Sequence, residues 1–278
     1  MSKDRNNIIE VKHLKVIVRE EGEETTLLHD SSFVVREGEC LGILGESGSG
    51  KSLTMQAFMG LLDEHFTITG EVIFEGKDLL KESGESLRRL RGSKLAMVMQ
   101  NPMTSFDPLL RIEEQVVETF VEHTDWTRSE IVKRALALFD KLQIRDPAET
   151  LKKYPHQLSG GMLQRIMIGI ALLLEPRLLI ADEPTTALDA LTQFEVLKEF
   201  RKVKDGGTAM VFITHDLGVA NYIADRILVM NKGHIVDTGT FREIVDKAKD
   251  PYTQLLIEKK TAVMRRYEAV MKGGVASA

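Results

Sequence analysis

One short segment of the sequence has the residue types and spacing of a phosphate-binding loop. It matches the pattern G-x-x-x-x-G-K-[ST] and lies between an apolar, strand-like run over 40–44 and a helical pattern. Glycines let backbone N–H groups approach phosphate oxygens, and a helix start adds a positive dipole end. Lys51 should reach the β- and γ-phosphates, and Ser52 should bind Mg²⁺. The candidate triphosphate site therefore comprises Gly45, Glu46, Ser47, Gly48, Ser49, Gly50, Lys51, Ser52 and the next residue, Leu53.

Two acidic residues follow another apolar run and supply chemistry that a phosphate loop lacks. The run 178–181 has the composition of a buried strand, and Asp182 and Glu183 come directly after it. Asp182 is the expected Mg²⁺ ligand, and Glu183 is placed to orient and polarise the attacking water. Taken alone, the pair also fits a solvated strand end before Pro184. The phosphate loop upstream favours the catalytic interpretation.

A third segment, 158–165, combines a helix cap with two glycines. Ser159 is a good N-cap residue, and Gly160 and Gly161 leave N–H groups open to an anion at the start of an apolar helix that continues to Leu174. A second anion cradle would serve a second phosphate group. As a bare pattern, a capped helix with a Gly-rich start explains the segment equally well.

Taken together, these segments resemble the ATP-binding cassette (ABC) family, the ATPase subunits of ABC transporters. The resemblance covers about 8–260, and its motifs occur in the family order. Besides the phosphate loop, the segment 158–164 and the acidic pair, the matching residues are Gln100, Ala187-Leu188-Asp189 and His215.

The family resemblance implies a head-to-tail dimer. Ser159, Gly160 and Gly161 of one subunit would close over ATP that the phosphate loop of the other subunit holds. Asp189 would line the dimer seam.

The resemblance also implies the remaining site roles. Gln100 would touch Mg²⁺ and sense the γ-phosphate, so that the implied metal ligands are Ser52, Gln100 and Asp182. His215 would contact the γ-phosphate and hold the geometry of Glu183 and its water. ATP and Mg²⁺ are the expected cofactors of an ATPase whose turnover is coupled to transport.

The sequence departs from the family pattern at two places. Met162 stands where the signature most often has Gln, which we expect to be tolerated because the phosphate contacts should come from Ser159 and backbone N–H groups. The family usually places an aromatic residue near the end of the first strand, where this chain has Val18. A stacked ring contributes about 0.5–1.5 kcal/mol beyond the area that it buries. We therefore expect apolar contact with adenine and weak base discrimination.

Longer stretches resemble the ATPases of oligopeptide, dipeptide and nickel importers. They are 100–108, 154–162, 181–189 and 250–256. Many peptide-importing members carry a C-terminal cysteine cluster, but Cys40 is the only cysteine of this chain. That absence favours the nickel or metal-chelate branch without excluding a peptide importer. When Pro251 and Tyr252 are taken alone, proline at the start of a helix is the favoured explanation.

The resemblance further implies the partners and the location. The partners would be a second ATPase subunit, often a different chain, and two integral membrane permease subunits. An extracytoplasmic solute-binding protein would take part indirectly. The subunit would lie peripherally on the cytoplasmic face of the cell membrane. The segment 103–112, with Met103, Phe106, Leu109 and Leu110, is a candidate membrane-subunit contact or, with equal weight, internal packing.

The pattern of elements predicts an α/β fold of the P-loop NTPase (RecA-like) type. An N-terminal antiparallel β subdomain comes from strands over 8–18, 27–35 and 70–74. Strands over 96–99, 210–213, 227–230 and 234–237 complete the core, and the last two flank a predicted hairpin at 231–233. Helical spacing over 112–174 predicts an inserted helical subdomain that carries the signature. We expect a catalytic core of 8–100 and 176–240, a helical subdomain of 101–175 and a helical tail of 241–278 that ends in a flexible 273–278.

Composition excludes several other classes of protein. The 278 residues carry a net charge of −5, which argues against a non-specific nucleic-acid binder. There is no apolar run of the roughly 20 residues that a membrane span needs. A repair ATPase of the same superfamily would carry a coiled coil or zinc insertion, for which 101–157 is too short and lacks cysteine. A soluble ABC ATPase of a cluster-assembly system remains the alternative to a transporter subunit.

Overall fold

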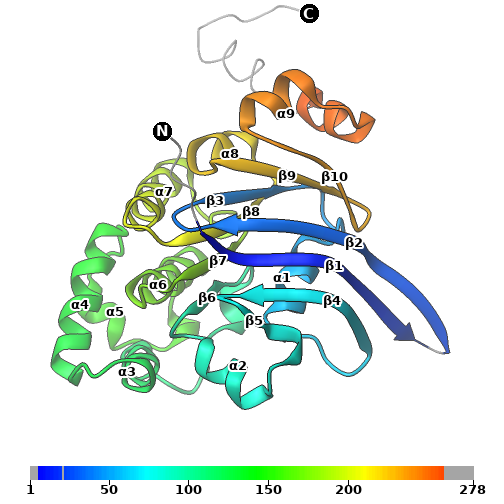
Figure 1. Cartoon of the computed structure of the whole chain (residues 1–278). Coiled ribbons are helices and arrows are strands. Elements are labelled where there is room, and N and C mark those ends of the chain that lie inside the picture. The colour runs from blue at the N-terminus through cyan, green and yellow to red at the C-terminus, as the bar shows by residue number, and fades with distance from the viewer. Residues whose placement is uncertain (1–5, 21, 260–278) are drawn as a thin grey trace, which may run out of the picture.

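The computed structural model of the protein describes residues 6–20 and 22–259. Its strands form two sheets (Figure 1), a six-stranded sheet in the order β10-β9-β3-β8-β7-β6 and a four-stranded sheet in the order β2-β1-β4-β5. In the six-stranded sheet all neighbours are parallel except β9 and β10. Its strands are β3 (Cys40–Leu44), β6 (Leu95–Val98), β7 (Leu178–Asp182), β8 (Ala209–Thr214), β9 (Arg226–Asn231) and β10 (His234–Gly239). The predicted α/β class is confirmed.

The parallel sheet is buried on both faces and separates two apolar cores. Along β7, Leu178 and Ile180 belong to one core, whereas Leu179 and Ala181 belong to the other. The alternation arises because successive side chains of a strand point to opposite faces. A continuous apolar run is therefore the expected sequence of such a strand.

The antiparallel sheet covers one of these cores. Its strands are β1 (Asn7–Glu20), β2 (Glu23–Arg36), β4 (Phe66–Phe74) and β5 (Lys77–Asp78). Helix α1 (Lys51–Phe58) contributes Met55 and Phe58 to the core that Val16 of β1 and Ile180 of β7 share. The helix after the phosphate loop is thus held between the two sheets (Figure 1).

A layer of helices covers the opposite face. Figure 1 shows α3, α4 and α5 gathered at one side of the molecule, and α6 packs against both α4 and β6. The predicted apolar positions Val116 and Phe120 are buried, but Val121 faces solvent. The helices of this face are α3 (Ile112–His123), α4 (Arg128–Lys141), α5 (Pro147–Leu151), α6 (Gly160–Leu173) and α7 (Ala190–Asp205).

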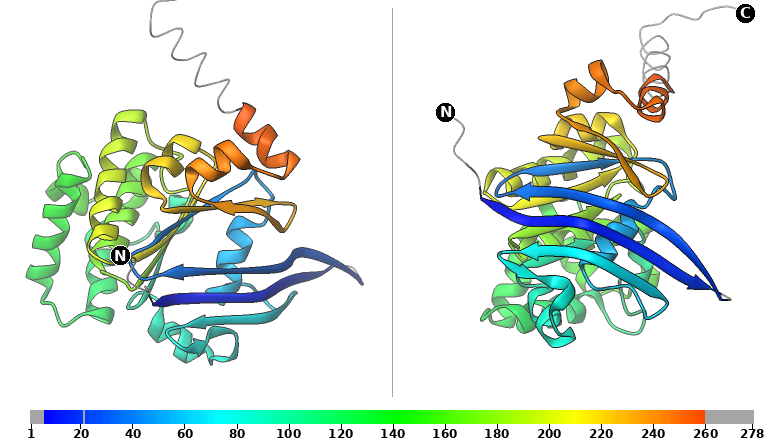
Figure 2. Two further views of the ribbon diagram at one scale, coloured as in Figure 1. Left: turned by 45° about the horizontal axis from the view of Figure 1, so that its top comes forward. Right: turned by 45° about the vertical axis from the view of Figure 1, so that its right-hand side comes forward.

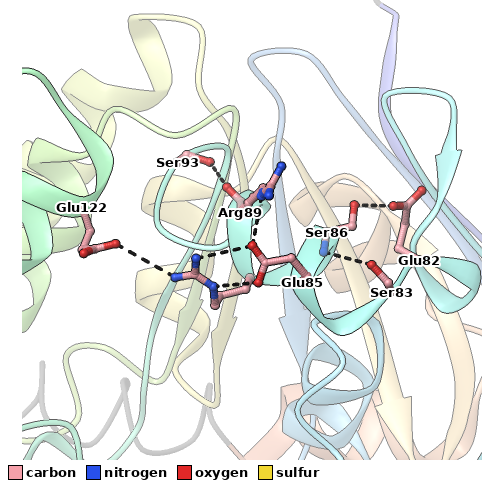
Figure 3. Close-up of polar contacts among 8 residues, drawn as sticks. Glu82, Ser83, Glu85, Ser86, Arg89, Ser93 and Glu122 are labelled. Carbon is pink, nitrogen blue, oxygen red and sulfur yellow. Dashed lines mark hydrogen bonds and ion pairs between the residues drawn. The ribbon is translucent and has the colours of Figure 1, made fainter.

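Charged side chains link the short helix α2 (Gly84–Leu90) to the helical layer (Figure 3). Ser83 caps the helix, and Glu85 pairs with Arg88 and Arg89 at 3.1 Å each. Arg88 also reaches Glu122 of α3 at 4.0 Å. These groups are exposed, and such pairs contribute about 0–1 kcal/mol each. They fix the orientation of α2 more than they stabilise the fold.

Several element boundaries differ from the predicted ones. The helical pattern after Lys51 predicted a helix through Leu62, but α1 ends at Phe58 because Gly60 takes a left-handed conformation with φ of 62°. Strand β4 begins four residues before the predicted Gly70, and β6 lies one residue earlier than predicted. The predicted hairpin at 231–233 joins β9 to β10, with both Lys232 and Gly233 at positive φ.

The described part of the chain ends in helices that pack beside β10 in both views of Figure 2. Helix α8 (Leu217–Ile223) precedes β9, α9 (Phe241–Lys247) follows β10, and a further helical segment covers 251–259. Within the range 241–278 that was predicted to be a helical tail, α9 and the segment 251–259 are helical, and 260–278, which include the predicted flexible 273–278, lie outside the described residues. Every helix over 6–20 and 22–259 is too short or too polar to span a bilayer.

The parallel strands bring the candidate residues to one edge of the sheet. Leu44, at the end of β3, is the register partner of Thr214 in β8, and Asp182 of β7 is the partner of Ile213. The segments that follow parallel strands at their carboxyl ends lie together, and open α/β sheets bind ligands at this edge. The phosphate loop, Glu183 and His215 are therefore neighbours.

Candidate functional site

The predicted phosphate loop connects β3 directly to α1. Gly50 is the N-cap of α1 with φ of 100°, and no side chain caps the helix. At Gly45 an added Cβ would lie 2.4 Å from the Met230 carbonyl oxygen and 2.5 Å from Ser49 Oγ, so only glycine fits. The first turn also lacks acidic residues. The helix start thus offers free N–H groups and a positive dipole end to an anion.

The Lys51 ammonium lies inside the loop. Its side chain is only 5% exposed, and Nζ donates to the carbonyl oxygens of Gly45 at 2.9 Å and Glu46 at 2.8 Å. Burial lowers the pKa of Lys51, while the charges of Glu183 and Asp182 oppose that shift. Its described hydrogen-bond partners, these two carbonyls and the Ser49 hydroxyl at 3.5 Å, are all uncharged. Such a buried cation is poised to bind anionic oxygens, which would compensate its charge.

Asp182 has the environment of a cation ligand. The residue is 3% exposed, and its Oδ1 has no hydrogen-bond partner within the described part of the chain. Burial raises the pKa of this carboxyl, hydrogen bonding to Ser52 lowers it, and the Glu183 charge raises it. A buried carboxylate oxygen without a partner is costly unless it meets a cation. Together with the Ser52 hydroxyl it forms an oxygen-rich set of the kind that Mg²⁺ prefers.

Three side chains from different segments converge on one oxygen of Glu183. Thr186 Oγ1 and His215 Nδ1 lie 3.2 Å from Oε2, and Gln100 Nε2 lies 3.4 Å from it. Among the described contacts, none falls on the other oxygen, Oε1. A carboxylate fixed through one oxygen can accept a proton from water at the second. The structure therefore brings the predicted Gln100, Glu183 and His215 together.

Thr186 is a residue of this cluster that sequence reasoning missed. It lies in the turn after β7, where its backbone N–H donates to the Glu183 carbonyl at 3.3 Å. A hydroxyl residue three positions after an acid at a strand end is a usable signal, because such a turn returns its side chain to the acid. Glu183 itself has φ of 45°, a left-handed conformation that is uncommon outside glycine.

The signature residues lie at a helix start of their own. Ser159 is the N-cap of α6 and accepts a hydrogen bond from the Met162 N–H at 3.3 Å. Gly160 has nothing within 4 Å of an added Cβ, whereas Gly161 lies beside the Ala187 carbonyl. Among the described residues, no hydrogen bond joins 159–161 to the phosphate loop. The second anion cradle is therefore separate from the first within one chain.

Asp189 has a local structural role. It is the N-cap of α7, and its carboxylate accepts from the Thr192 N–H at 3.0 Å. Hydrogen bonding to Thr192 lowers the pKa of Asp189, which therefore stays ionised at the start of the helix. The residue is exposed, so a partner surface can reach it.

Val18 lies on β1 and is 8% exposed. Its register partner on β4 is Phe66, and directly opposed residues of antiparallel strands share one face of the sheet. The two residues line the same open cleft as His65 and Asp63. An aromatic ring thus stands beside Val18, contributed by a neighbouring strand and not by β1.

The apolar segment 103–112 divides into exposed and buried residues. Met103 is 52% exposed and Leu109 is 81% exposed. Phe106, which the sequence grouped with them, packs into the helical core instead. Beside it lies a cleft of about 330 Å³ between the core sheet and the helical layer, which Phe106 and Leu61 line. Exposed apolar side chains around such a cleft are typical of a protein contact surface.

Comparisons with known proteins find relatives that match most of the chain. The family model described as ABC transporter matches residues 28–186. The metal-staphylopine import system ATP-binding protein CntD of Staphylococcus aureus is 43% identical over 96% of this chain and 98% of its own. The oligopeptide transport ATP-binding protein OppD of Bacillus subtilis is 42% identical over 88% of this chain and 70% of its own. A dimeric ATP-binding cassette solved with ADP and phosphate superimposes with a TM-score of 0.77, at 28% identity, over 84% of this chain and 99% of that one.

Proposed function

Because the chain belongs to the ABC transporter family, we propose that it is the ATPase subunit of an importer and that Glu183 activates the hydrolytic water. The observation that carries the assignment of Glu183 is its carboxylate, held through Oε2 by Gln100, Thr186 and His215. Both relatives named above are import ATPases, one for metal-staphylopine and one for oligopeptides. The nearly full-length match to the first favours a metal chelate as the solute.

The proposed hydrolysis uses residues from several segments. Lys51 and the loop N–H groups bind the triphosphate. Glu183 Oε1 takes a proton from water while Thr186 and His215 hold the carboxylate in place. His215 would also contact the γ-phosphate. Electrostatic positioning of this kind is the main source of catalysis in phosphoryl transfer.

The proposed Mg²⁺ site consists of Ser52, Gln100 and Asp182. Its main support is the buried Asp182 Oδ1, which has no partner in the described part of the chain. Bound Mg²⁺ would offset negative charge on the phosphates.

The second half of the nucleotide site comes, in this proposal, from another subunit. Ser159, Gly160 and Gly161 would contact the phosphates held by the partner's loop, and Asp189 would face the seam. The separation of the two cradles within one chain supports this arrangement. The dimeric cassette solved with ADP and phosphate is consistent with it.

We further propose the division into a core of 8–100 and 176–240, a helical subdomain of 101–175 and a tail from 241. The helical subdomain and the cleft beside Phe106 would meet two integral membrane permease subunits, which places the protein peripherally on the cytoplasmic face of the membrane. Met103 and Leu109 would contact the permease.

Affinity purification from membranes tests this docking. The tagged chain is expected to co-purify with integral membrane proteins, and Met103→Glu should reduce their recovery several-fold because a charge would be buried at the contact. Val121→Glu, at an exposed apolar position of α3 outside the cleft, is the matched control. Purification of the wild-type chain without any membrane protein would instead support a soluble ABC ATPase of a cluster-assembly system.

Weak base discrimination is a second expectation, because the first strand offers no aromatic residue for adenine. The dissociation constants of ATP and GTP, measured by calorimetry, should differ by less than about tenfold. A preference for ATP above about a hundredfold would contradict it. If Phe66→Ala then removed that preference, the strand beside Val18 would be the source of the stacking ring.

A further inference from the structure

Tyr252, near the end of the described chain, contacts the phosphate loop. Its hydroxyl oxygen accepts a hydrogen bond from the backbone N–H of Glu46 at 2.7 Å. The two residues are 206 positions apart in the sequence. Tyr252 belongs to the helical segment 251–259, which packs beside β10 (Figure 2) and lies outside the core elements of the site.

The peptide group that Tyr252 contacts also holds Lys51. The Glu46 N–H and the Gly45 carbonyl belong to one planar peptide unit and point in opposite directions. On one side the N–H donates to Tyr252, and on the other the carbonyl accepts from Lys51 Nζ at 2.9 Å. Rotation of this peptide unit would move both groups together. The tyrosine hydroxyl thus fixes the direction of an oxygen that anchors the lysine ammonium.

The Tyr252 ring is held firmly enough to serve as such an anchor. It packs in an apolar cluster with Leu44, the last residue before the loop, and with Leu256 of its own segment. Its backbone N–H donates to Asp250 Oδ1 at 2.8 Å, and the Asp250 N–H donates to Asp237 Oδ2 of β10 at 3.2 Å. Burial raises the pKa of the Tyr252 hydroxyl, so the group stays protonated at neutral pH.

We propose that Tyr252 is a positioning residue of the nucleotide site, which aligns the Gly45–Glu46 peptide and through it the Lys51 ammonium. The inference rests on the proposed function of the loop in holding the triphosphate. The contact between Tyr252 and Glu46 makes the helical segment 251–259 part of the ATP site. A chain that lacked this segment would keep every motif of the loop but would lose the alignment of its lysine.

Tyr252→Phe tests the proposal because it removes only the hydroxyl. The Glu46 N–H would then bond to water, and the peptide unit would lose its fixed direction. We expect the KM for ATP to rise about three- to tenfold, as for the loss of one hydrogen bond, with kcat within about twofold of wild type. The melting temperature should stay unchanged. Hydrogen exchange at the Glu46 amide should become faster.

The matched control is Tyr222→Phe, in α8, which removes a hydroxyl away from the loop. It should change neither the KM for ATP nor the rate of hydrogen exchange at the Glu46 amide. A double-mutant cycle separates positioning from general packing, because Tyr252→Phe should have no further effect on ATP affinity in a Lys51→Ala background. An unchanged KM in Tyr252→Phe, or additive losses in the double mutant, would overturn the role of Tyr252. If Lys51→Ala also bound ATP normally, the proposed function of the loop would fail instead.

Discussion

Glu183→Gln is expected to lower the steady-state rate of ATP hydrolysis by at least about a hundredfold while ATP binding is retained. The amide has the shape of the carboxylate but cannot take a proton from water. Thr186 and His215 would still have an oxygen or nitrogen to contact at the same place, so the local structure should persist. Phosphate release measured at saturating ATP gives the rate, and calorimetry gives the affinity.

The same variant should accumulate as an ATP-bound dimer, because closure over ATP would no longer be reversed by hydrolysis. Light scattering after gel filtration, with and without ATP, measures this state. Glu175→Gln is the matched control, since this exposed glutamate lies before β7 at the end of the strand opposite to Glu183. Hydrolysis by Glu183→Gln at the wild-type rate would show that another group activates the water.

Lys51→Ala is expected to weaken ATP binding by roughly ten- to a hundredfold, which corresponds to the loss of about 1.4–2.7 kcal/mol of charge-assisted hydrogen bonding. The alanine would also free the carbonyl oxygens of Gly45 and Glu46, which the ammonium now holds. ATP and ADP titrations by calorimetry measure the loss, and it should be larger for ATP because the lysine is expected to reach the γ-phosphate.

Lys152→Ala is the control for the removal of one positive charge. Lys152 is exposed, and among the described contacts its only ion pair is with Glu149 of α5. Its affinity for ATP should equal that of the wild type. An unchanged affinity for ATP in Lys51→Ala would count against the assignment of this loop as the triphosphate site.

The core strands could be predicted from the sequence because burial on both faces leaves a clear signature. The run 40–44 and the run 178–181 are apolar without alternation, and each becomes a central strand. Their order in the sheet could not be read from the residues, since β3 pairs with β8, about 170 positions later.

The contacts of the site that could not be predicted from the sequence are those that depend on a turn or on tertiary packing. Neither Thr186 nor Tyr252 has a side chain whose type marks it as part of a nucleotide site, and each acquires its role from a turn or from tertiary packing. Phe106 illustrates the opposite case. The sequence left a surface contact and internal packing equally open for Phe106 and Met103, because a pattern alone does not tell which apolar residues of a loop are buried.

The backbone conformation of Glu183 lowers the stability of the folded protein at the residue that we propose to activate the water. A non-glycine residue at φ of 45° carries about 1–3 kcal/mol of conformational strain, which the surrounding structure must offset. Glycine at this position would relieve the strain and remove the carboxylate together. If Glu183 activates the water as proposed, selection for thermal stability alone would therefore favour an inactive enzyme.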